Sequence, residues 1–243
     1  MNLSVLQNFK DTDLHLDPYP FLFIENALPT DLYERLATEY PERILEVGPS
    51  SFSDFRYCQE DFSSEYVTPL WKDFVDFHTS KEYKDQLINA LLPGLKKYYP
   101  DIVEKYLNSE VCLRHETVQG ALRLEVQFVM NSPDTQRIRT PHLDQGRELF
   151  ACLFYFKKPE DLSTGGDLIV YKKTTDPFIF NKGRIAPIDQ IEEVARVPYK
   201  ENTLVAFLNT LDSIHGVSQR IEPKTIRRYV NIDGHVEEKL FRL

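Results

Sequence analysis

The sequence has 243 residues, of which 42% are hydrophobic and 12% aromatic, and its formal net charge at pH 7 is −9. This length and hydrophobic content fit one domain with a large core, and the negative charge disfavours nucleic acid as a partner because it repels phosphate backbones. No apolar run approaches the length of a membrane span, and the first ten residues lack the basic and apolar regions of a secretory signal. The cysteines Cys58, Cys112 and Cys152 are odd in number and form no CxxC, so we expect reduced thiols in a cytoplasmic protein.

The N-terminal part, residues 1–108, is expected to consist of helices and loops. Apolar residues recur at helical spacing between Thr30, which can cap a helix, and Pro41, which ends it. A second helical region is predicted over residues 80–107, with an interruption near Pro93-Gly94. We interpret this part as a decoration of one domain, because no linker separates it from the rest of the chain.

From about residue 110 the pattern changes to the period of two that is typical of β-strands. Turn-forming Pro, Gly, Asn and Asp residues separate these stretches. Several short strands joined by turns predict a mainly β fold with flanking helices, a double-stranded β-helix (jelly-roll) barrel over residues 109–235 within a single domain of residues 1–243. The expected strands are Leu122–Val129, Leu149–Phe156, Asp167–Tyr171, Thr203–Leu208 and Ile226–Ile232.

A candidate metal site begins with His142 and Asp144, which are separated by one residue. On an extended strand such side chains point to the same face, and His215 from a distant strand can add a second imidazole. Two histidines and one carboxylate form the facial triad of non-haem Fe(II) oxygenases. An isolated pair of this kind is weak evidence, because a histidine in a β-rich core is more often structural. Here Pro141 and Gly146 flank the pair, which places it where a strand ends or bends.

The chain resembles the 2-oxoglutarate and Fe(II)-dependent oxygenase superfamily, and within it the prolyl-4-hydroxylase-like group, over roughly residues 110–235. The pieces that match, in the family's order, are Pro141-His142-Leu143-Asp144, Leu153-Phe154-Tyr155-Phe156, Gly165-Gly166-Asp167-Leu168, His215-Gly216-Val217 and an arginine in the following strand. The resemblance implies that His142, Asp144 and His215 bind Fe(II), with 2-oxoglutarate and O2 as cosubstrates. Because Asp144 retains the carboxylate that halogenating members replace, it also implies hydroxylation.

The same resemblance implies an arginine on the strand after His215 that binds the far carboxylate of 2-oxoglutarate. Arg220 lies too close to His215, in the predicted turn. Arg228 shares one strand face with apolar residues, and we expect that face to point into the barrel. Arg227 lies on the other face and is the alternative; both can also be surface arginines on a strand rim.

Two further residues are candidates for binding 2-oxoglutarate. Tyr155 matches a position where the family often places a tyrosine that contacts the same carboxylate, although a tyrosine in an apolar strand can equally be a core residue. Gln127 lies on a strand before the His-x-Asp pair and either reaches the cosubstrate or points outward. The remaining histidines have no visible ligand-spaced partner and are interpreted as ordinary residues: His15, His78, His115 and His235.

We therefore expect an enzyme that hydroxylates an unactivated C–H bond of a small molecule or a peptidyl residue and releases succinate and CO2. The first alternative is a cupin-like metal-binding protein that does not use 2-oxoglutarate. This alternative would be favoured if no cationic side chain faced the iron. The second is a binding module in which His142 and His215 are structural. Residues 47–68 predict a long loop with one or two short elements, and this loop is either a substrate lid or packed on the barrel. The substrate and the oligomeric state stay open.

Overall fold

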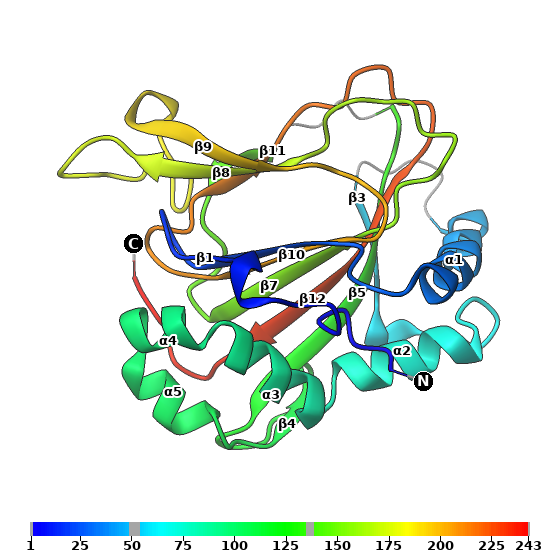
Figure 1. Ribbon diagram of the computed structural model, residues 1–243, viewed down its shortest axis with the longest axis horizontal. Helices are drawn as coiled ribbons and strands as arrows, with labels where there is room; N and C mark the ends of the chain where they lie inside the picture. The colour runs from blue at the N-terminus through cyan, green and yellow to red at the C-terminus, as the bar shows by residue number, and fades with distance from the viewer. Residues whose placement is uncertain (1, 49–53, 135–138, 243) are drawn as a thin grey trace.

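The computed structural model describes residues 2–48, 54–134 and 139–242 and contains two β-sheets that face each other. Helices cover the outer side of the larger sheet, and the smaller sheet lies opposite its inner side (Figure 1). The expectation of a mainly β fold with flanking helices is confirmed. The strands of the described residues form two separate sheets, so the hydrogen-bonded ladder does not continue from one sheet into the other.

The larger sheet is built from antiparallel neighbours, except that β4 pairs with β5 in parallel. Its order is β1 (Leu14–His15), β2 (Phe21–Glu25), β10 (Thr203–Leu208), β7 (Glu148–Tyr155), β12 (Arg227–His235), β5 (Leu122–Asn131) and β3 (Asp54–Cys58), with β4 (Val111–Leu113) also beside β5. The order of the smaller sheet is β6 (Arg139–His142), β11 (His215–Val217), β8 (Leu168–Lys173) and β9 (Ile191–Val197).

All five strands expected from the sequence are present, and the predicted bounds of β10 are the observed ones. The N-terminal part also supplies β1 and β2, which the sequence did not predict, and β3, which lies in the segment where one or two short elements were expected. All three strands join the larger sheet. The strand β9 was missed as well. It lies at the edge of the smaller sheet with most of its residues exposed or half-buried, so it lacks the apolar alternation that marks a strand.

The helices are short, with seven to ten residues each. They are α1 (Thr30–Thr38), α2 (Pro69–His78), α3 (Lys81–Ala90), α4 (Leu92–Tyr98) and α5 (Pro100–Tyr106), with 3-10 turns η1 (Asp11–Asp13), η2 (Glu42–Glu46), η3 (Gln59–Asp61) and η4 (Ile188–Gln190). The first helix begins at Thr30 as predicted. The predicted region 80–107 becomes three helices, because Pro93 and Pro100 each lie in a first helical turn, where a missing N–H is tolerated.

The main core lies between the larger sheet and the helices. Trp71 of α2 packs edge-on against Phe128 of β5, with ring centroids 4.8 Å apart, and its Nε1 donates to the carbonyl of Leu36. The side chain of Lys84 is fully buried and donates to three backbone carbonyls at the end of α5. Because the helices cover the apolar face of this sheet, its other face is left to line the space between the sheets.

Residues 47–68 fall partly outside the described residues, since 49–53 are not described. The rest contributes β3, which pairs with β5 along the edge of the larger sheet. Tyr57 and Phe62 pack into the main core, whereas Arg56 lines the space between the sheets. Within this segment, β3 is therefore an integral part of the larger sheet.

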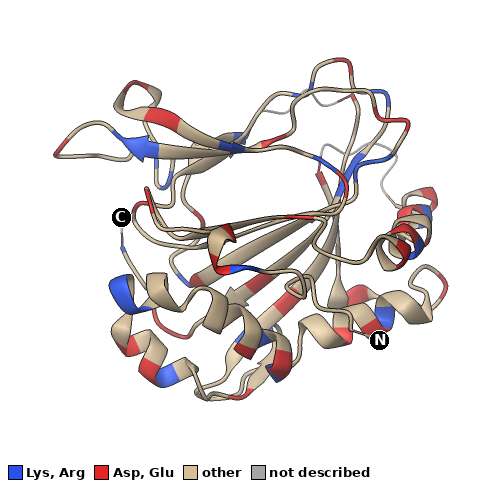
Figure 2. Ribbon diagram, in the orientation of Figure 1, with Lys and Arg blue, Asp and Glu red and all other residues tan. Residues whose placement is uncertain are grey.

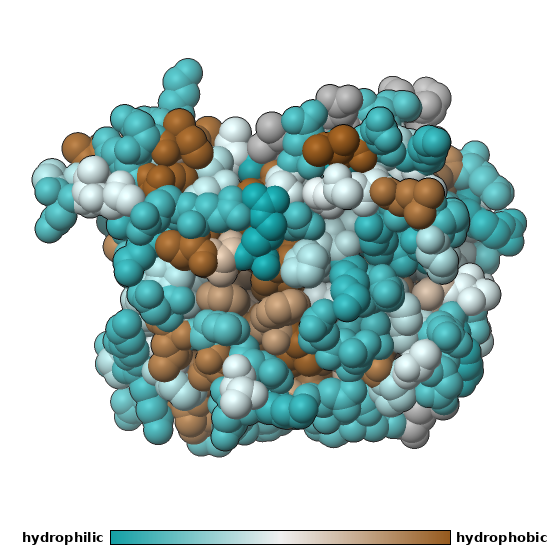
Figure 3. All heavy atoms as spheres, turned by 45° about the horizontal axis from the view of Figure 1, so that its top comes forward, coloured by the Kyte–Doolittle hydropathy of each residue, from teal (hydrophilic) through white to brown (hydrophobic). Residues whose placement is uncertain are grey.

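Charges of both signs are interspersed along the helices and the β8–β9 arm (Figure 2). The face shown in the space-filling view is mostly hydrophilic, and hydrophobic side chains gather in its centre (Figure 3). Among the helices of the described residues, none combines the length and the apolar character needed to cross a bilayer.

Candidate active site

His142, Asp144 and His215 come together at the pairing of β6 with β11. His142 ends β6 and His215 begins β11, and the antiparallel register places the two residues opposite each other. Asp144 follows β6 by two residues. All three side chains are buried. The sequence spacing thus places the three expected metal ligands in one location.

The ligand atoms lie at separations suited to one metal ion. Nε2 of His142 is 3.6 Å from Oδ1 of Asp144, and Nε2 of His215 is 3.5 Å from Oδ2 of the same carboxylate. Metal–nitrogen and metal–oxygen bonds of about 2.0–2.2 Å put neighbouring ligand atoms roughly 3.0–3.4 Å apart. Small side-chain movements are therefore enough for the three groups to share one ion.

Hydrogen bonds fix which nitrogen of each imidazole faces the carboxylate. Nδ1 of His142 donates to the carbonyl of Thr140 at 2.8 Å, and Nδ1 of His215 donates to that of Ser213 at 2.9 Å. Because a carbonyl only accepts, each Nδ1 carries the hydrogen and each Nε2 keeps its lone pair for a metal. Histidines that bind metals in proteins commonly show this arrangement.

The protonation states also suit a metal. Burial lowers the pKa of His215 to about 4, against the opposing pull of Asp144, so its imidazole is neutral near pH 7. Burial acts to raise the pKa of Asp144, but the neighbouring His215 and His142 hold it below its usual range. The site therefore presents a neutral imidazole at His215 and an ionised carboxylate at Asp144, and both are donor types of a facial triad.

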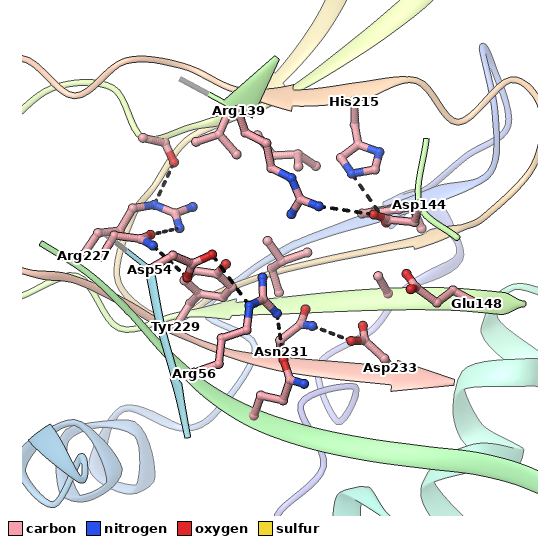
Figure 4. Close-up of a pocket in the computed structure, with 18 of the residues that line it drawn as sticks. Asp54, Arg56, Arg139, Asp144, Glu148, His215, Arg227, Tyr229, Asn231 and Asp233 are labelled. Atoms are coloured by element: carbon pink, nitrogen blue, oxygen red, sulfur yellow. Dashed lines mark hydrogen bonds and ion pairs between the residues drawn. The ribbon is translucent and has the colours of Figure 1, made fainter. Parts of the chain in front are cut away.

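A cavity of about 380 Å³ lies between the sheets, with His215 and Asp144 at one end (Figure 4). The larger sheet forms its floor, and alternate residues of β12 point into it: Arg227, Tyr229, Asn231 and Asp233. Arg139 reaches in from β6, where its Nη2 lies 3.6 Å from Oδ1 of Asp144.

Arg227 lies at the other end of the cavity (Figure 4). Its Nε donates to the carbonyl of Gly166 at 3.1 Å, and its Nη1 donates to Oδ1 of Asn131 at 3.3 Å. Its Nη2 is buried and has no hydrogen-bond partner among the described residues. This arginine is 3% exposed, and no carboxylate of the described residues forms an ion pair with it, so those residues leave its charge without a counter-ion.

Three tyrosine rings surround this guanidinium. Its Cζ lies 5.2 Å from the ring centroid of Tyr155, 4.8 Å from that of Tyr199 and 4.6 Å from that of Tyr229, distances at which cation–π attraction acts. The Tyr155 hydroxyl is buried and has no hydrogen-bond partner in the described ranges. Two unsatisfied donors, the Tyr155 hydroxyl and Nη2 of Arg227, therefore occur in the same aromatic cluster.

The prediction that Arg228 faces the site is wrong. The face it shares with Val230 and Ile232 packs under the helices, and its Nε donates to the carbonyl of Phe156 at 2.8 Å while Nη1 pairs with Glu42 at 3.2 Å. The apolar face of β12 is the one the helices cover, whereas the face that lines the cavity is polar. The alternative, Arg227, is the arginine that points into the cavity.

Arg220 also lines the cavity, but its guanidinium already has a carboxylate partner. Its Nη2 pairs with Asp161 at 2.9 Å, and both side chains are almost fully buried. Gln127 points into the cavity, and its Oε1 accepts a hydrogen bond of 2.7 Å from Nη1 of Arg56. The sequence did not single out Arg56, although the alternation of polar and aromatic residues through β3 was a usable signal.

The cavity also has an acidic side that the sequence did not reveal. Burial and the nearby Asp144 raise the pKa of Glu148 to about 7. Burial raises the pKa of Asp233 further, and Glu148 and Asp144 add to this shift. Carboxyl groups collected in a buried space repel one another when ionised, and a bound cation relieves that repulsion.

The interpretation that His235 lacks a ligand-spaced partner is also wrong. Asp233 lies two residues before it on β12, and Glu125 of β5 is close to both. His78 is a satisfied core residue, as expected: Nδ1 donates to the carbonyl of Phe74, and Nε2 accepts from the backbone N–H of Val5.

No protein-family model and no curated protein matches this sequence. Solved structures do match. A prolyl-4-hydroxylase from Pseudomonas putida is 16% identical, with a TM-score of 0.50 over 90% of this chain and 93% of that one. Prolyl 4-hydroxylase from Phytophthora capsici is 15% identical, with a TM-score of 0.50 over 89% of this chain and 59% of that one.

A third match is the epimerase SnoN in complex with Fe3+, alpha ketoglutarate and nogalamycin RO. It is 11% identical, with a TM-score of 0.52 over 88% of this chain and 78% of that one. Identities this low show a shared fold and nothing more about this chain. The resemblance drawn from the sequence is thereby confirmed at the level of the fold.

Proposed function

We propose that this chain is a mononuclear Fe(II) and 2-oxoglutarate-dependent oxygenase that hydroxylates a C–H bond and releases succinate and CO2. One observation carries the proposal. Two imidazoles and a carboxylate form a buried group, and two of its members, His215 and Asp144, line the same cavity as a buried arginine whose Nη2 has no partner in the described chain. The first group suits a divalent iron and the second suits a carboxylate.

The metal would be held by His142, Asp144 and His215. Two nitrogen donors and one hard oxygen donor suit Fe(II), and three protein ligands leave further positions for small molecules. The backbone carbonyls of Thr140 and Ser213 fix both imidazoles with Nε2 toward the ion. When bound, iron together with 2-oxoglutarate and O2 supplies the oxidant for C–H hydroxylation.

The far carboxylate of 2-oxoglutarate would bind at Arg227 and Tyr155. Both offer a buried donor with no partner among the described residues, and a carboxylate accepts from both while neutralising the guanidinium. The three surrounding tyrosine rings keep the arginine in place, and the backbone carbonyl of Gly166 orients its Nε. Arg228 is not proposed for this role, because it pairs with Glu42 on the opposite face of the strand.

The cupin-like alternative, a metal protein that does not use 2-oxoglutarate, is less well supported. It leaves Arg227 as a buried cation with no carboxylate partner among the described residues, which is costly in a medium of low polarity. It also leaves the Tyr155 hydroxyl with no hydrogen-bond partner from residues 2–48, 54–134 and 139–242. A ligand with a second carboxylate removes both costs at once.

The remaining residues of the cavity would bind and orient the substrate. A volume of about 380 Å³ is within the range of small-molecule sites, so we propose a small molecule or a single peptidyl side chain as the substrate. Arg56 and Arg139 can contact acidic groups of such a substrate, and Glu148 and Asp233 can contact basic or hydroxyl groups. The fold shared with prolyl-4-hydroxylases and with SnoN is compatible with either class.

The proposal is tested by binding measured without oxygen. The Fe(II)-loaded protein is titrated calorimetrically with 2-oxoglutarate and, as a matched control, with 2-oxobutyrate, which has the same 2-oxo acid end but no far carboxylate. We expect 2-oxoglutarate to bind at least roughly tenfold more tightly, since one charge-assisted hydrogen bond contributes about 1.5–3 kcal/mol.

Turnover is then measured as succinate released in air with a panel of candidate substrates. A protein that binds Fe(II) but binds both oxo acids equally would contradict the role of Arg227 and favour the cupin-like alternative. Absence of both 2-oxoglutarate binding and succinate formation would overturn the proposed function as a whole.

A further inference from the structure

A second group of potential metal ligands lies on the cavity side of the larger sheet. Asp233 and His235 are two residues apart on β12, so they lie on the same face of the strand, and Glu125 of β5 is directly opposite Asp233 in the register. One ligand atom from each residue lies within 4.8 Å of the other two. The group shares no residue with His142, Asp144 and His215.

Two atoms of this group are buried and unsatisfied. Nε2 of His235 and Oδ1 of Asp233 have no hydrogen-bond partner among the described residues, and both residues are 7% exposed. Buried polar atoms are nearly always paired in folded proteins, so an unpaired imidazole nitrogen next to an unpaired carboxylate oxygen calls for an explanation. A bound cation satisfies both atoms at the same time.

We propose that Glu125, Asp233 and His235 form a second metal site that binds a divalent first-row transition-metal ion. An imidazole and two carboxylates provide one nitrogen donor and hard oxygen donors, a set that suits Mn2+, Fe2+ or Zn2+. The geometry favours a compact ion over an organic cation, because the three ligand atoms lie within 4.8 Å of one another on two adjacent strands.

The neighbouring side chains prepare the carboxylates for a cation. Nδ2 of Asn231 donates to Oδ2 of Asp233 at 2.5 Å, which orients the other oxygen of that carboxylate toward the group. Nη1 of Arg114 contacts Oε2 of Glu125, so Oε1 is available as a ligand. Hydrogen bonds of this kind position the ligands around protein-bound metals.

The side chains around the site carry charges of both signs. The acidic ones are Glu125, Asp144, Glu148 and Asp233, and the basic ones are Arg56, Arg114, Arg123, Arg139 and Arg184. Asp233 and Glu125 lie directly opposite each other on adjacent strands, and a divalent ion between them relieves the repulsion of their carboxylates.

The second site is independent of the proposed oxygenase function, because the two groups of ligands are separate. Two bound ions are expected for each chain, one at each group. A structural effect is also expected, because an ion at the second site joins β5 and β12, which are adjacent strands of the larger sheet. Binding that is specific to the folded state raises the melting temperature.

The test measures metal stoichiometry with Mn2+ on protein whose affinity tag has been removed. Equilibrium dialysis followed by elemental analysis gives the number of ions per chain, and electron paramagnetic resonance reports bound Mn2+. The variants are His142→Ala/His215→Ala, which disables the first group, and Asp233→Asn/His235→Gln, which disables the second. His115→Gln is the matched control, because this half-exposed histidine belongs to neither group.

We expect two ions in the wild type and in the His115→Gln control, and one ion in each double variant. We expect none when all four substitutions are combined. A wild type that binds one ion, together with a His142→Ala/His215→Ala variant that binds none, would overturn the second site while leaving the first intact. A wild type that binds one ion, together with an Asp233→Asn/His235→Gln variant that binds none, would instead contradict the proposed triad.

The buried substitutions at 233 and 235 can also impair folding, so a second measurement keeps the inference testable. The His142→Ala/His215→Ala variant retains the second group unchanged, and its melting temperature is measured with and without Mn2+. We expect Mn2+ to raise it. No shift and no bound ion in this variant, with circular dichroism matching the wild type, would refute the second site.

Discussion

The guanidinium groups of Arg227 and Arg228 lie on opposite faces of β12, although the two residues are neighbours in the chain. Arg227 points into the cavity and contacts Gly166 and Asn131, whereas Arg228 points under the helices and pairs with Glu42. The two positions therefore form a matched pair. They carry the same charge on the same strand, and only one of them can reach a ligand between the sheets.

Replacing Arg227 by Gln is expected to weaken 2-oxoglutarate binding by about 2–5 kcal/mol, the cost of removing one partner of a buried charge pair. Replacing Arg228 by Gln is expected to leave that affinity nearly unchanged and to lower stability, because the contact with Glu42 is lost. Calorimetric titration and thermal unfolding of both variants separate the two effects. The roles would have to be exchanged if only Arg228→Gln lost 2-oxoglutarate.

Replacing Tyr155 by Phe is expected to affect binding and stability differently. The hydroxyl has no partner among the described residues, so its removal breaks no hydrogen bond there and should leave the melting temperature unchanged or slightly raised. The affinity for 2-oxoglutarate should fall by about 1.5 kcal/mol, because a donor to the carboxylate is lost. A loss of stability with unchanged affinity would show that Tyr155 is only a core residue.

Replacing Asp144 by Ala removes the only carboxylate of the triad. Two neutral imidazoles then remain, and we expect Fe(II) affinity at this site to fall by at least roughly tenfold, since losing a ligand costs more than losing a hydrogen bond to a ligand. Asp189→Ala serves as control, because Asp189 is exposed and belongs to neither group of potential ligands. Unchanged Fe(II) affinity in Asp144→Ala, measured with the second site disabled, would contradict its role as a ligand.

Gly165 has a positive φ of 78°, and a Cβ added there would lie 1.9 Å from the backbone oxygen of Gln219. Gly165→Ala must therefore displace this turn, whose next residue, Gly166, accepts the hydrogen bond from Arg227. We expect weaker 2-oxoglutarate binding together with a loss of stability. Gly183→Ala is the control, because its φ is also positive but its surroundings are open; it should lose about 1 kcal/mol of stability and no affinity.

Acid is expected to destabilise the protein through His78. Burial lowers the pKa of this histidine to about 3, below the value of about 6.5 expected in the unfolded chain. The unfolded state therefore binds the proton first, so the contribution is complete above pH 6.5 and is lost as the pH falls toward 3, by about 1.4 kcal/mol for each pH unit.

The measurement is the free energy of unfolding in urea between pH 7 and pH 4.5. His78→Gln should show a shallower decline than the wild type, and the exposed His115→Gln should decline in parallel with it. Equal slopes in wild type and His78→Gln would mean that His78 does not titrate as its burial requires.

The second group of potential ligands, Glu125, Asp233 and His235, could not be recognised from a single sequence motif. Asp233-Gly234-His235 has the same spacing as His142-Leu143-Asp144, but it was not recognised because no partner was visible in the sequence. Glu125 becomes its neighbour only through the pairing of β12 with β5, which joins residues more than a hundred positions apart. Spacing along a strand is local information, whereas the identity of the adjacent strand is not.

The sequence by itself determined the mainly β fold, the five central strands and the candidate triad of His142, Asp144 and His215. These follow from patterns of period two and from spacings within short segments, which local backbone geometry turns directly into shared faces. Only the tertiary structure decided which face of β12 lines the cavity. That choice depends on where the helices pack: they cover the apolar face, which leaves Arg227, Asp233 and His235 on the polar face between the sheets.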